Sequence, residues 1–409
     1  MRKLVFIAGL IVLALVVADF FRNDHEDLLL KKSPTSFSDK GSSSDKNAPG
    51  VGLPIDVAWP EYRNSQELPG RVKKIPGDKF KVIWKFQSGA PIKSGAIVED
   101  GIVFFSNSKG HVSALNAKTG EPVWQKCFCN PITSTGLFLK VNDVPQLFVG
   151  NKHGDFLAMN ASSGELLYKF KTGGAINGGA TFFRGDDGLK VLFGSYDSRL
   201  YCLDSASGKE QWKFETSNYI NGTPALSSGT FILGGCDGIL RGINPSTGKQ
   251  AFSLNLGSYI PSSPACSGNV AYVALQTNEV FAVDLSKFKI LWKFQAEGQV
   301  EFYSPPAVSE NYVVAPDSDG RIYVLKKSNG EKVRTLKLSG KLESEAIVDA
   351  NKLLVADLDG FIYCFNLDSG AMLWRFGHGS AISAPLTVFD QYLLICDLDG
   401  WVTLYSQEQ

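Results

Sequence analysis

Seven cysteines and four histidines are the residues of this 409-residue chain that could act as nucleophiles, metal ligands or disulfide partners. Cys127 and Cys129 are separated only by Phe128. On a strand both thiols would point the same way, where a bridge between them would be strained. A disulfide that involves either residue stays open, because seven unpaired thiols are unusual in an oxidising compartment. The other cysteines mostly continue apolar runs and are expected to be small buried hydrophobic residues, among them Cys202, Cys364 and Cys396.

The histidines do not form a metal-binding or nucleophilic pattern. They are His25, His111, His153 and His378, and the sequence contains no HxH, HExxH or Cys/His cluster. GxSxG, Walker and GxGxxG motifs are absent as well. The sequence therefore predicts no catalytic residue, no cofactor-binding residue and no metal ligand, and the chain is not expected to be an enzyme.

An Asp-x-Asp-Gly motif occurs three times, at residues 317–320, 357–360 and 397–400. A calcium loop requires further carboxylates at alternate positions and a closing acidic residue. Here apolar strand residues follow the glycine at once. We therefore expect these aspartates to support tight turns by accepting hydrogen bonds from backbone amides.

One phrase that recurs about every 41 residues must position all of these groups. Its versions include KGHVSALNAKTGEPVW, DSRLYCLDSASGKEQW and DGFIYCFNLDSGAMLW, and the eight copies begin near residues 110, 154, 198, 238, 279, 320, 360 and 400. Each unit holds short apolar or alternating runs between glycine-bearing turns and shows no helical periodicity. Four strands in a repeat of this length are typical of a β-propeller blade.

The two ends of the repeat region complement each other. The eighth phrase, LDGWVTLY, has no outer strand after it, whereas KVIWKF at residues 81–86 matches an outer strand that has no blade before it. The sequence thus predicts an all-β fold over residues 81–405. This fold is an eight-bladed β-propeller of four-stranded blades, closed by the N-terminal strand completing the last blade.

A bulky side chain recurs four residues after the turn glycine of most units, and the strand at residues 81–86 carries another. A large ring at this outer-strand position suits the widening wedge between neighbouring blades. We expect this packing role for Trp84, Trp124, Tyr168, Trp212, Phe252, Trp292, Arg334 and Trp374.

The inner strands are expected to line the ring axis. They carry small or polar residues, which predicts a water-filled channel and leaves open whether a ligand binds in its mouth. The residues are Lys93, Ser94, Thr133, Ser134, Asn177, Asn221, Ser262, Ser263, Glu301, Glu343 and Glu345. No binding residue is assigned from this pattern.

The N-terminal region has the layout of an export signal. A basic start is followed by the apolar run at residues 4–18, with Val16 and Ala18 as small residues near a cleavage point. Residues 1–21 are predicted to be a signal peptide or an uncleaved N-terminal membrane anchor. Residues 22–80 are predicted to be a flexible linker, because residues 33–54 lack periodic apolar residues. Within it, residues 55–79 are expected to pack partly on the domain through Trp59 and Tyr62.

The repeat phrase resembles that of the PQQ-like β-propeller family over residues 81–405, and the chain is most similar to the BamB family within it. This resemblance implies a non-enzymatic, periplasmic scaffold without a cofactor. It also implies protein partners in the outer-membrane β-barrel assembly machinery. Lipoprotein members carry a lipid-bearing cysteine, which is missing after the apolar run here. Association with the outer membrane, or anchoring at the inner membrane, would then depend on the N-terminal segment or on partners.

Two alternatives remain open. PQQ-dependent quinoprotein dehydrogenases are similar in fold; they hold PQQ and Ca²⁺ on the axis and often carry a disulfide between adjacent cysteines, whereas this sequence has no Cys-Cys pair. A membrane-anchored sensor or cell-surface propeller with an unknown ligand is the other alternative. Equal numbers of basic and acidic side chains, 41 of each, argue against a nucleic-acid partner.

Overall fold

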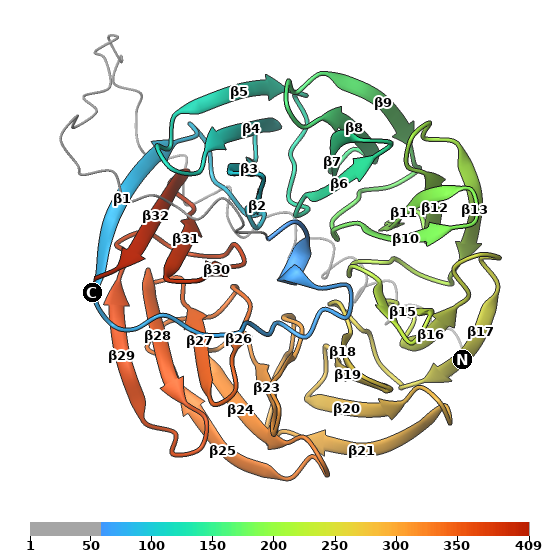
Figure 1. Cartoon of the computed structure of the whole chain (residues 1–409). Helices are drawn as coiled ribbons and strands as arrows, with labels where there is room; N and C mark the ends of the chain where they lie inside the picture. Colours follow the sequence, from blue (N-terminus) through green and yellow to red (C-terminus); the bar gives the residue numbers. More distant parts are fainter. Residues whose placement is uncertain (1–58, 409) are drawn as a thin grey trace, which may run out of the picture. The chain divides into compact units, whose positions relative to one another are not determined.

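The computed structural model describes residues 59–408. In this part of the chain, eight four-stranded antiparallel sheets form a closed ring (Figure 1). The predicted eight-bladed propeller is confirmed. The predicted signal peptide or anchor, residues 1–21, lies outside the described residues, as does the predicted linker up to residue 58. A single 3₁₀ turn, η1 (Tyr62–Asn64), is the one helical element of the described residues, and none of their helices is long and apolar enough to cross a membrane.

The strands of the first four blades follow one another as simple meanders. Blade 1 consists of β2 (Ile97–Glu99), β3 (Ile102–Ser106), β4 (His111–Asn116) and β5 (Pro122–Cys127). Blade 2 consists of β6 (Leu137–Val141), β7 (Val144–Gly150), β8 (Asp155–Asn160) and β9 (Leu166–Lys171). Blade 3 consists of β10 (Thr181–Gly185), β11 (Gly188–Ser195), β12 (Arg199–Asp204) and β13 (Glu210–Glu215). Blade 4 consists of β14 (Ala225–Ser227), β15 (Thr230–Gly234), β16 (Ile239–Ile243) and β17 (Gln250–Asn255).

The next three blades repeat this order, and the last one differs. Blade 5 consists of β18 (Ala265–Ser267), β19 (Val270–Ala274), β20 (Glu279–Asp284) and β21 (Lys289–Gln295). Blade 6 consists of β22 (Ala307–Val308), β23 (Tyr312–Pro316), β24 (Arg321–Lys326) and β25 (Lys332–Lys337). Blade 7 consists of β26 (Ile347–Val348), β27 (Lys352–Ala356), β28 (Phe361–Asn366) and β29 (Met372–Gly377). Blade 8 consists of β30 (Thr387–Phe389), β31 (Tyr392–Cys396) and β32 (Trp401–Gln407), and β1 (Phe80–Gln87) completes it.

Strand β1 closes the ring. It pairs antiparallel with β32 from Phe80 opposite Gln407 to Gln87 opposite Trp401, with one irregularity between Val82 and Trp84. In Figure 1, β1 lies on the outer side of β32, where every other blade has its own fourth strand. The predicted closure by the N-terminal strand is confirmed.

The bulky outer-strand residues fill the wedges between blades, as predicted. Trp124 is the one buried residue of β5. Its indole Nε1 donates to the carbonyl of Ala161 in blade 2 at 2.8 Å. A Cβ added at Gly164, which has a φ of +70°, would lie only 2.6 Å from the Trp124 ring. The turn glycine is therefore required both for its backbone conformation and for the close approach of the neighbouring blade.

The same contact recurs around the ring. Trp84 packs on Gly120, Trp212 on Gly248 and Trp292 on Gly330. Each of these indoles also donates to a carbonyl of the next blade, at 2.8–3.0 Å. The repeat phrase is thus the sequence signature of a blade-to-blade contact.

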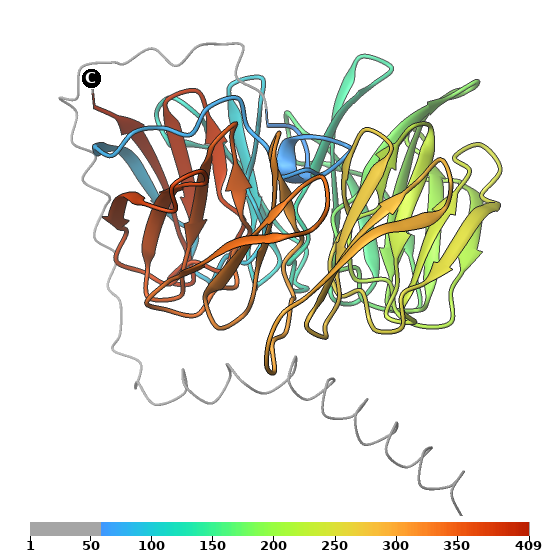
Figure 2. The ribbon, with the colours of Figure 1, turned by 90° about the horizontal axis from the view of Figure 1, so that it is seen from below.

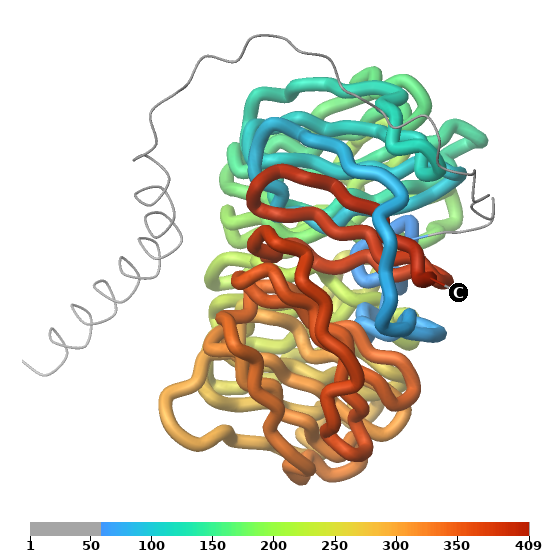
Figure 3. The backbone as a smooth tube through the Cα atoms, turned by 90° about the vertical axis from the view of Figure 1, so that its left-hand side faces the viewer, coloured from blue at the N-terminus to red at the C-terminus, as the bar shows by residue number. Residues whose placement is uncertain are grey.

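Residues 59–79 lie on one face of the ring, and we call them the strap. Figures 2 and 3 show the strap on that face, and Figure 1 shows it entering the centre of the ring and leaving over blades 7 and 8. Trp59 and Tyr62 are buried. Within the predicted linker, Trp59 and Tyr62 thus pack on the propeller, as expected of part of residues 55–79.

Main-chain hydrogen bonds hold the strap to the inner strands of six blades. Trp59 pairs with Val98 of blade 1. Strap carbonyls then accept from inner-strand amides in ring order, at 2.7–2.9 Å: Pro60 from Phe138, Gln66 from Leu226, Glu67 from Cys266, Pro69 from Val308 and Gly70 from Val348. An inner strand has one edge without a neighbouring strand, so the amides on that edge need other hydrogen-bond acceptors. The strap supplies them.

Candidate functional site: the axial cavity

A cavity of about 200 Å³ lies on the ring axis. Most of its lining residues come from the irregular segments that precede the inner strands, rather than from the strands themselves. The structure brings together eight of the predicted channel residues there: Lys93, Thr133, Asn177, Asn221, Ser262, Ser263, Glu343 and Glu345.

Three predicted channel residues are not among those that line the cavity. Ser94 and Ser134 are buried within their blades, where their hydroxyls donate to the carbonyls of Ser106 and Gly150 at 2.9 and 2.8 Å. Glu301 is exposed and accepts a hydrogen bond from Tyr303 at 3.0 Å. Adjacent positions of these irregular segments therefore do not follow a fixed rule, since Lys93 lines the cavity and Ser94 does not, whereas Ser262 and Ser263 both line it.

The cavity wall is polar and incompletely hydrogen-bonded. Among the described residues, five side-chain oxygens of the wall are buried without a hydrogen-bond partner: Thr133 Oγ1, Asn177 Oδ1, Ser262 Oγ, Glu345 Oε2 and Ser383 Oγ. Buried polar atoms normally find a partner, and a polar space of this size accommodates several water molecules. The lining therefore suits water or a small polar solute.

The strap closes one end of the cavity through η1. Tyr62 donates a short hydrogen bond to Glu345, and Arg63 lies 3.6 Å from the other carboxylate oxygen of Glu345. Arg63 also donates to the carbonyl of Pro306 at 2.9 Å. Burial raises the pKa of Glu345, while Arg63 and the hydrogen bond from Tyr62 oppose this shift. Sequence reasoning missed this network, since nothing in the repeat marks Glu345 as the partner of a residue 282 positions earlier.

The burial of Glu61, just before η1, predicts that the stability of the protein depends on pH. Burial raises its pKa from 4.5 to about 7. Between these pH values the folded protein holds a proton that the unfolded chain releases, so stability falls as pH rises. A shift of this size corresponds to about 3 kcal/mol. We expect Glu61→Gln to remove this dependence and to stabilise the protein by about 1–3 kcal/mol at pH 8.

Urea unfolding of both proteins from pH 4.5 to 8 measures the effect of Glu61. The exposed Glu310 provides the matched control, Glu310→Gln, which should follow the wild type at every pH. Parallel curves for wild type and Glu61→Gln across this range would contradict the assignment.

The aspartates of the Asp-x-Asp-Gly motifs support turns, as predicted. The first aspartate of each motif accepts from the amide four residues later: Asp317 from Arg321, Asp357 from Phe361 and Asp397 from Trp401, at 2.8–2.9 Å. Among the described residues, no group of three His, Cys, Asp or Glu side chains could hold a metal ion.

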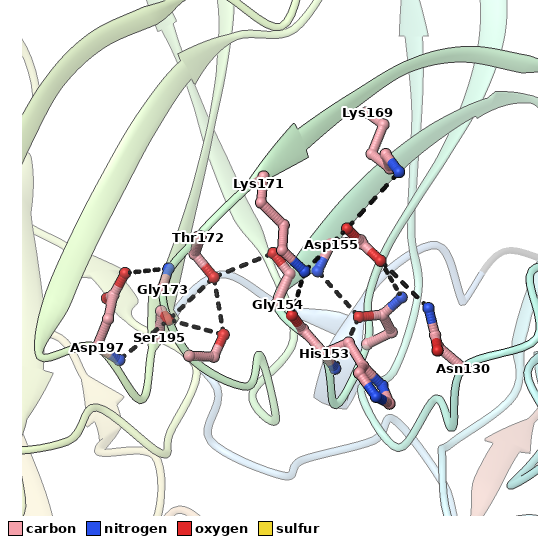
Figure 4. A network of polar contacts seen from close by, with 12 residues as sticks. Asn130, His153, Gly154, Asp155, Lys169, Lys171, Thr172, Gly173, Ser195 and Asp197 are labelled. Carbon is pink, nitrogen blue, oxygen red and sulfur yellow. Dashed lines mark hydrogen bonds and ion pairs between the residues drawn. The ribbon is translucent and has the colours of Figure 1, made fainter.

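In the corresponding turn of blade 2, Asn151 stands where the motifs have their first aspartate, and its Oδ1 accepts from the amide of Asp155 at 2.9 Å. Asp155, four residues later, forms a further polar network (Figure 4). Asp155 accepts hydrogen bonds from Asn151 at 3.0 Å and Asn130 at 3.3 Å, and it lies 3.3 Å from the ammonium group of Lys171. Burial alone would raise the pKa of Asp155, but the hydrogen bonds and Lys171 lower it. His153 takes part through its main chain, since its carbonyl accepts from Lys171.

His378 has the most defined surroundings of the described histidines. Its Nε2 lies 2.9 Å from Asp397, its Nδ1 lies 2.9 Å from the Tyr405 hydroxyl, and the side chain is buried. The network joins blade 7 to blade 8 and is remote from the residues that line the cavity. His111 begins β4, and its buried Nδ1 has no hydrogen-bond partner among the described residues.

The seven cysteines divide into three groups, one of which is the partly buried Cys236 alone. Four are buried, as expected of small hydrophobic residues: Cys202, Cys266, Cys364 and Cys396. Cys127 and Cys129 are exposed, and their sulfur atoms are 3.0 Å apart. The expectation that both lie on one strand is wrong, because β5 ends at Cys127 and the chain turns before Cys129, which has a φ of +57°.

Comparison with known proteins places the chain in a family. The model of outer membrane protein assembly factor BamB matches residues 70–166, 108–259, 152–293 and 257–347, which together cover more than half of the chain. The chain belongs to the BamB family. A sequence search of curated proteins finds no significant match.

Solved structures share the propeller with this BamB-family chain. The crystal structure of BamB from Moraxella catarrhalis has a TM-score of 0.66 at 20% identity, and the match covers 81% of this chain and 98% of that one. Quinohemoprotein alcohol dehydrogenase from Comamonas testosteroni has a TM-score of 0.73 at 12% identity, covering 88% and 83%. A europium-containing methanol dehydrogenase has a TM-score of 0.69 at 12% identity, covering 86% and 98%. At these identities the likeness shows the fold alone.

The axial residues of this BamB-family chain do not fit PQQ, the cofactor of quinoprotein dehydrogenases. The cavity of about 200 Å³ is smaller than the ~300–1,000 Å³ usual for small-molecule sites. Glu343 and Glu345 share the wall with Lys93, and among the described residues no group of three acidic, His or Cys side chains could hold the Ca²⁺ that accompanies the cofactor. Tyr62 and Arg63 fill the space above Glu345.

Proposed function

We propose that this protein is a non-catalytic scaffold of the BamB type that assists the assembly and insertion of β-barrel proteins into the outer membrane. Its partners would be members of the outer-membrane β-barrel assembly machinery. It would be exported and periplasmic, attached to the outer membrane or anchored at the inner membrane through its N-terminal segment. The observation that carries the non-catalytic part is the strap, which inserts Tyr62 and Arg63 into the axis and ties them to Glu345.

The propeller supports this role by its rigidity and its surface. The strap joins the inner strands of six blades, and the wedge residues join each blade to the next. The rim exposes pairs of apolar residues at the starts of several outer strands: Leu166 and Leu167, Ile290 and Leu291, and Met372 and Leu373. Exposed apolar groups with polar surroundings are the usual core of a protein interface.

Affinity purification of the tagged full chain from its native envelope tests the proposal. We expect the barrel-insertion subunit to co-purify, and we expect deletion of the gene to lower the amount of folded β-barrel proteins in the outer membrane. A tagged periplasmic protein of unrelated fold serves as the control. Purification without the barrel-insertion machinery, together with normal barrel proteins in the deletion strain, would overturn the proposal.

A second assay separates the scaffold from the enzyme that shares its fold. Likeness to alcohol and methanol dehydrogenases makes PQQ-dependent oxidation the alternative function. Reduction of an electron-accepting dye by the protein with an alcohol or a sugar, in the presence of PQQ and Ca²⁺, would support that alternative. We expect no dye reduction above the rate without protein, because the cavity is small and the described residues provide no group of three Ca²⁺ ligands. A membrane-anchored sensor or cell-surface propeller would instead leave barrel assembly unchanged on deletion.

A further inference from the structure

Cys127 and Cys129 lie next to each other at the outer edge of blade 1. Both are exposed, and their Sγ atoms are 3.0 Å apart. We propose that these two thiols form a dithiol–disulfide redox site, which cycles between two thiols and a Cys127–Cys129 disulfide. This role goes beyond the proposed scaffold function and does not depend on it.

The backbone at Cys129 supports this proposal. Its φ of +57° lies in the left-handed region, which residues with a β-carbon rarely adopt. Cys129 is the second residue after the end of β5. The residues at the same place after β1, β17 and β29 are Gly89, Gly257 and Gly379, with φ values of +78°, +94° and +97°. Blade 1 thus has a cysteine where three other blades have a glycine, and strained residues of this kind concentrate at functional sites.

The neighbours of Cys129 hold it in this conformation. The amide of Phe128 donates to the carbonyl of Gly110 at 2.9 Å, and the side chain of Asn130 donates to Asp155 at 3.3 Å (Figure 4). The chain is therefore anchored on both sides of Cys129. A disulfide requires two β-carbons at close range with suitable directions, so a site whose sulfurs already touch can close with little rearrangement.

The environment favours redox chemistry over metal binding. Among the described residues, no third His, Cys, Asp or Glu side chain joins the pair to complete a metal site. The hydrogen bond with Cys127, followed by the charge of Cys127, raises the pKa of Cys129. Because a raised pKa slows attack by Cys129, we assign the first attack to Cys127.

The reaction requires a disulfide as oxidant, and oxidised glutathione is the probe that we choose. The Cys127 thiolate attacks one glutathione sulfur, which releases one glutathione thiolate and leaves a mixed disulfide on Cys127. Cys129 then loses its proton to solvent and attacks the Cys127 sulfur, which releases the second glutathione. Two protein thiols are oxidised, and one oxidised glutathione is reduced to two thiols.

Mass spectrometry of the full chain, reduced and then equilibrated with glutathione mixtures, tests the proposal. Trypsin releases both cysteines in one peptide, residues 127–140, because Lys126 and Lys140 flank it. At an oxidising ratio we expect this peptide to lack two hydrogen atoms and to carry no glutathione. Adding excess reduced glutathione should restore two thiols that react with iodoacetamide.

Two variants sharpen the test, because the repeat supplies replacements that suit each position. Cys129→Gly and Cys127→Gln copy Gly89 and Gln87 of blade 8 and should leave the thermal unfolding curve near that of the wild type. Cys129→Gly should retain glutathione on Cys127, since no second thiol can release it. The matched control, Cys236→Ser, should close the disulfide as the wild type does. Wild-type peptide that carries two glutathiones, or two free thiols at a ratio where Cys129→Gly is glutathionylated, would overturn the proposal.

Discussion

Replacing Trp124 by alanine is expected to lower the free energy of unfolding by about 3–5 kcal/mol. Trp124 is 8% exposed and fills the space between blades 1 and 2. Its ring packs on Gly164, and its Nε1 donates to the Ala161 carbonyl at 2.8 Å. The substitution removes this hydrogen bond and leaves a cavity that the two blades cannot collapse into, because the remaining strands of both are fixed in their own sheets.

Urea unfolding followed by circular dichroism measures the effect of Trp124→Ala. Trp401 offers a matched control, because it is a tryptophan on an adjacent blade that is 38% exposed. We expect Trp401→Ala to change the free energy of unfolding by about 1 kcal/mol or less. Equal losses in the two variants would show that the indole at the wedge position has no special role in joining the blades.

The ring of blades could be predicted from the sequence because the turn glycine and the bulky outer-strand residue recur at fixed spacing for a steric reason. Gly164 cannot carry a side chain beside Trp124, so the turn glycine and the bulky residue occur together in most units. Closure was predictable for the same reason, since Trp84 is a wedge residue without a preceding turn glycine. These contacts join neighbouring repeats at a constant spacing, which the sequence shows directly.

The strap was predicted only in part, because most of its contacts are main-chain hydrogen bonds that do not require particular side chains. Pro60, Glu67 and Pro69 bind the inner strands through main-chain carbonyls, which every residue type has. The buried Trp59 and Tyr62 were the only signals in that segment. A more general argument was available, since each inner strand of a propeller has an unpaired edge that must find hydrogen-bond partners or water.

The candidate site could be predicted as a location more readily than as a set of interactions. Eight axial residues were anticipated, although they were placed on the inner strands and lie in the irregular segments before them. Ser94 and Ser134 were not separable from their neighbours Lys93 and Thr133, because a short irregular segment does not follow a strict alternation. The pairing of Arg63 with Glu345 depends on the path of the strap, which the repeat does not encode.

The pairing of Arg63 with Glu345 leads to the second prediction with a large expected effect. Glu345→Ala is expected to destabilise the docked strap by about 3–5 kcal/mol, because it leaves the buried guanidinium of Arg63 without a carboxylate. The Arg63 side chain is 3% exposed, so water does not replace the lost partner. Hydrogen exchange measures this loss at the inner-strand amides that bind the strap, those of Phe138, Leu226, Cys266, Val308 and Val348. We expect them to exchange about 10²–10⁴ times faster.

The double variant Arg63→Met with Glu345→Leu distinguishes an unpaired charge from lost packing. Replacing a buried ion pair by apolar groups of similar volume is often close to neutral, so the double variant should restore most of the protection that Glu345→Ala loses. Glu301→Ala, at an exposed carboxylate, should leave exchange unchanged. If the double variant lost as much protection as Glu345→Ala, the strap would be held by the shape of Glu345 and Arg63 rather than by their charges.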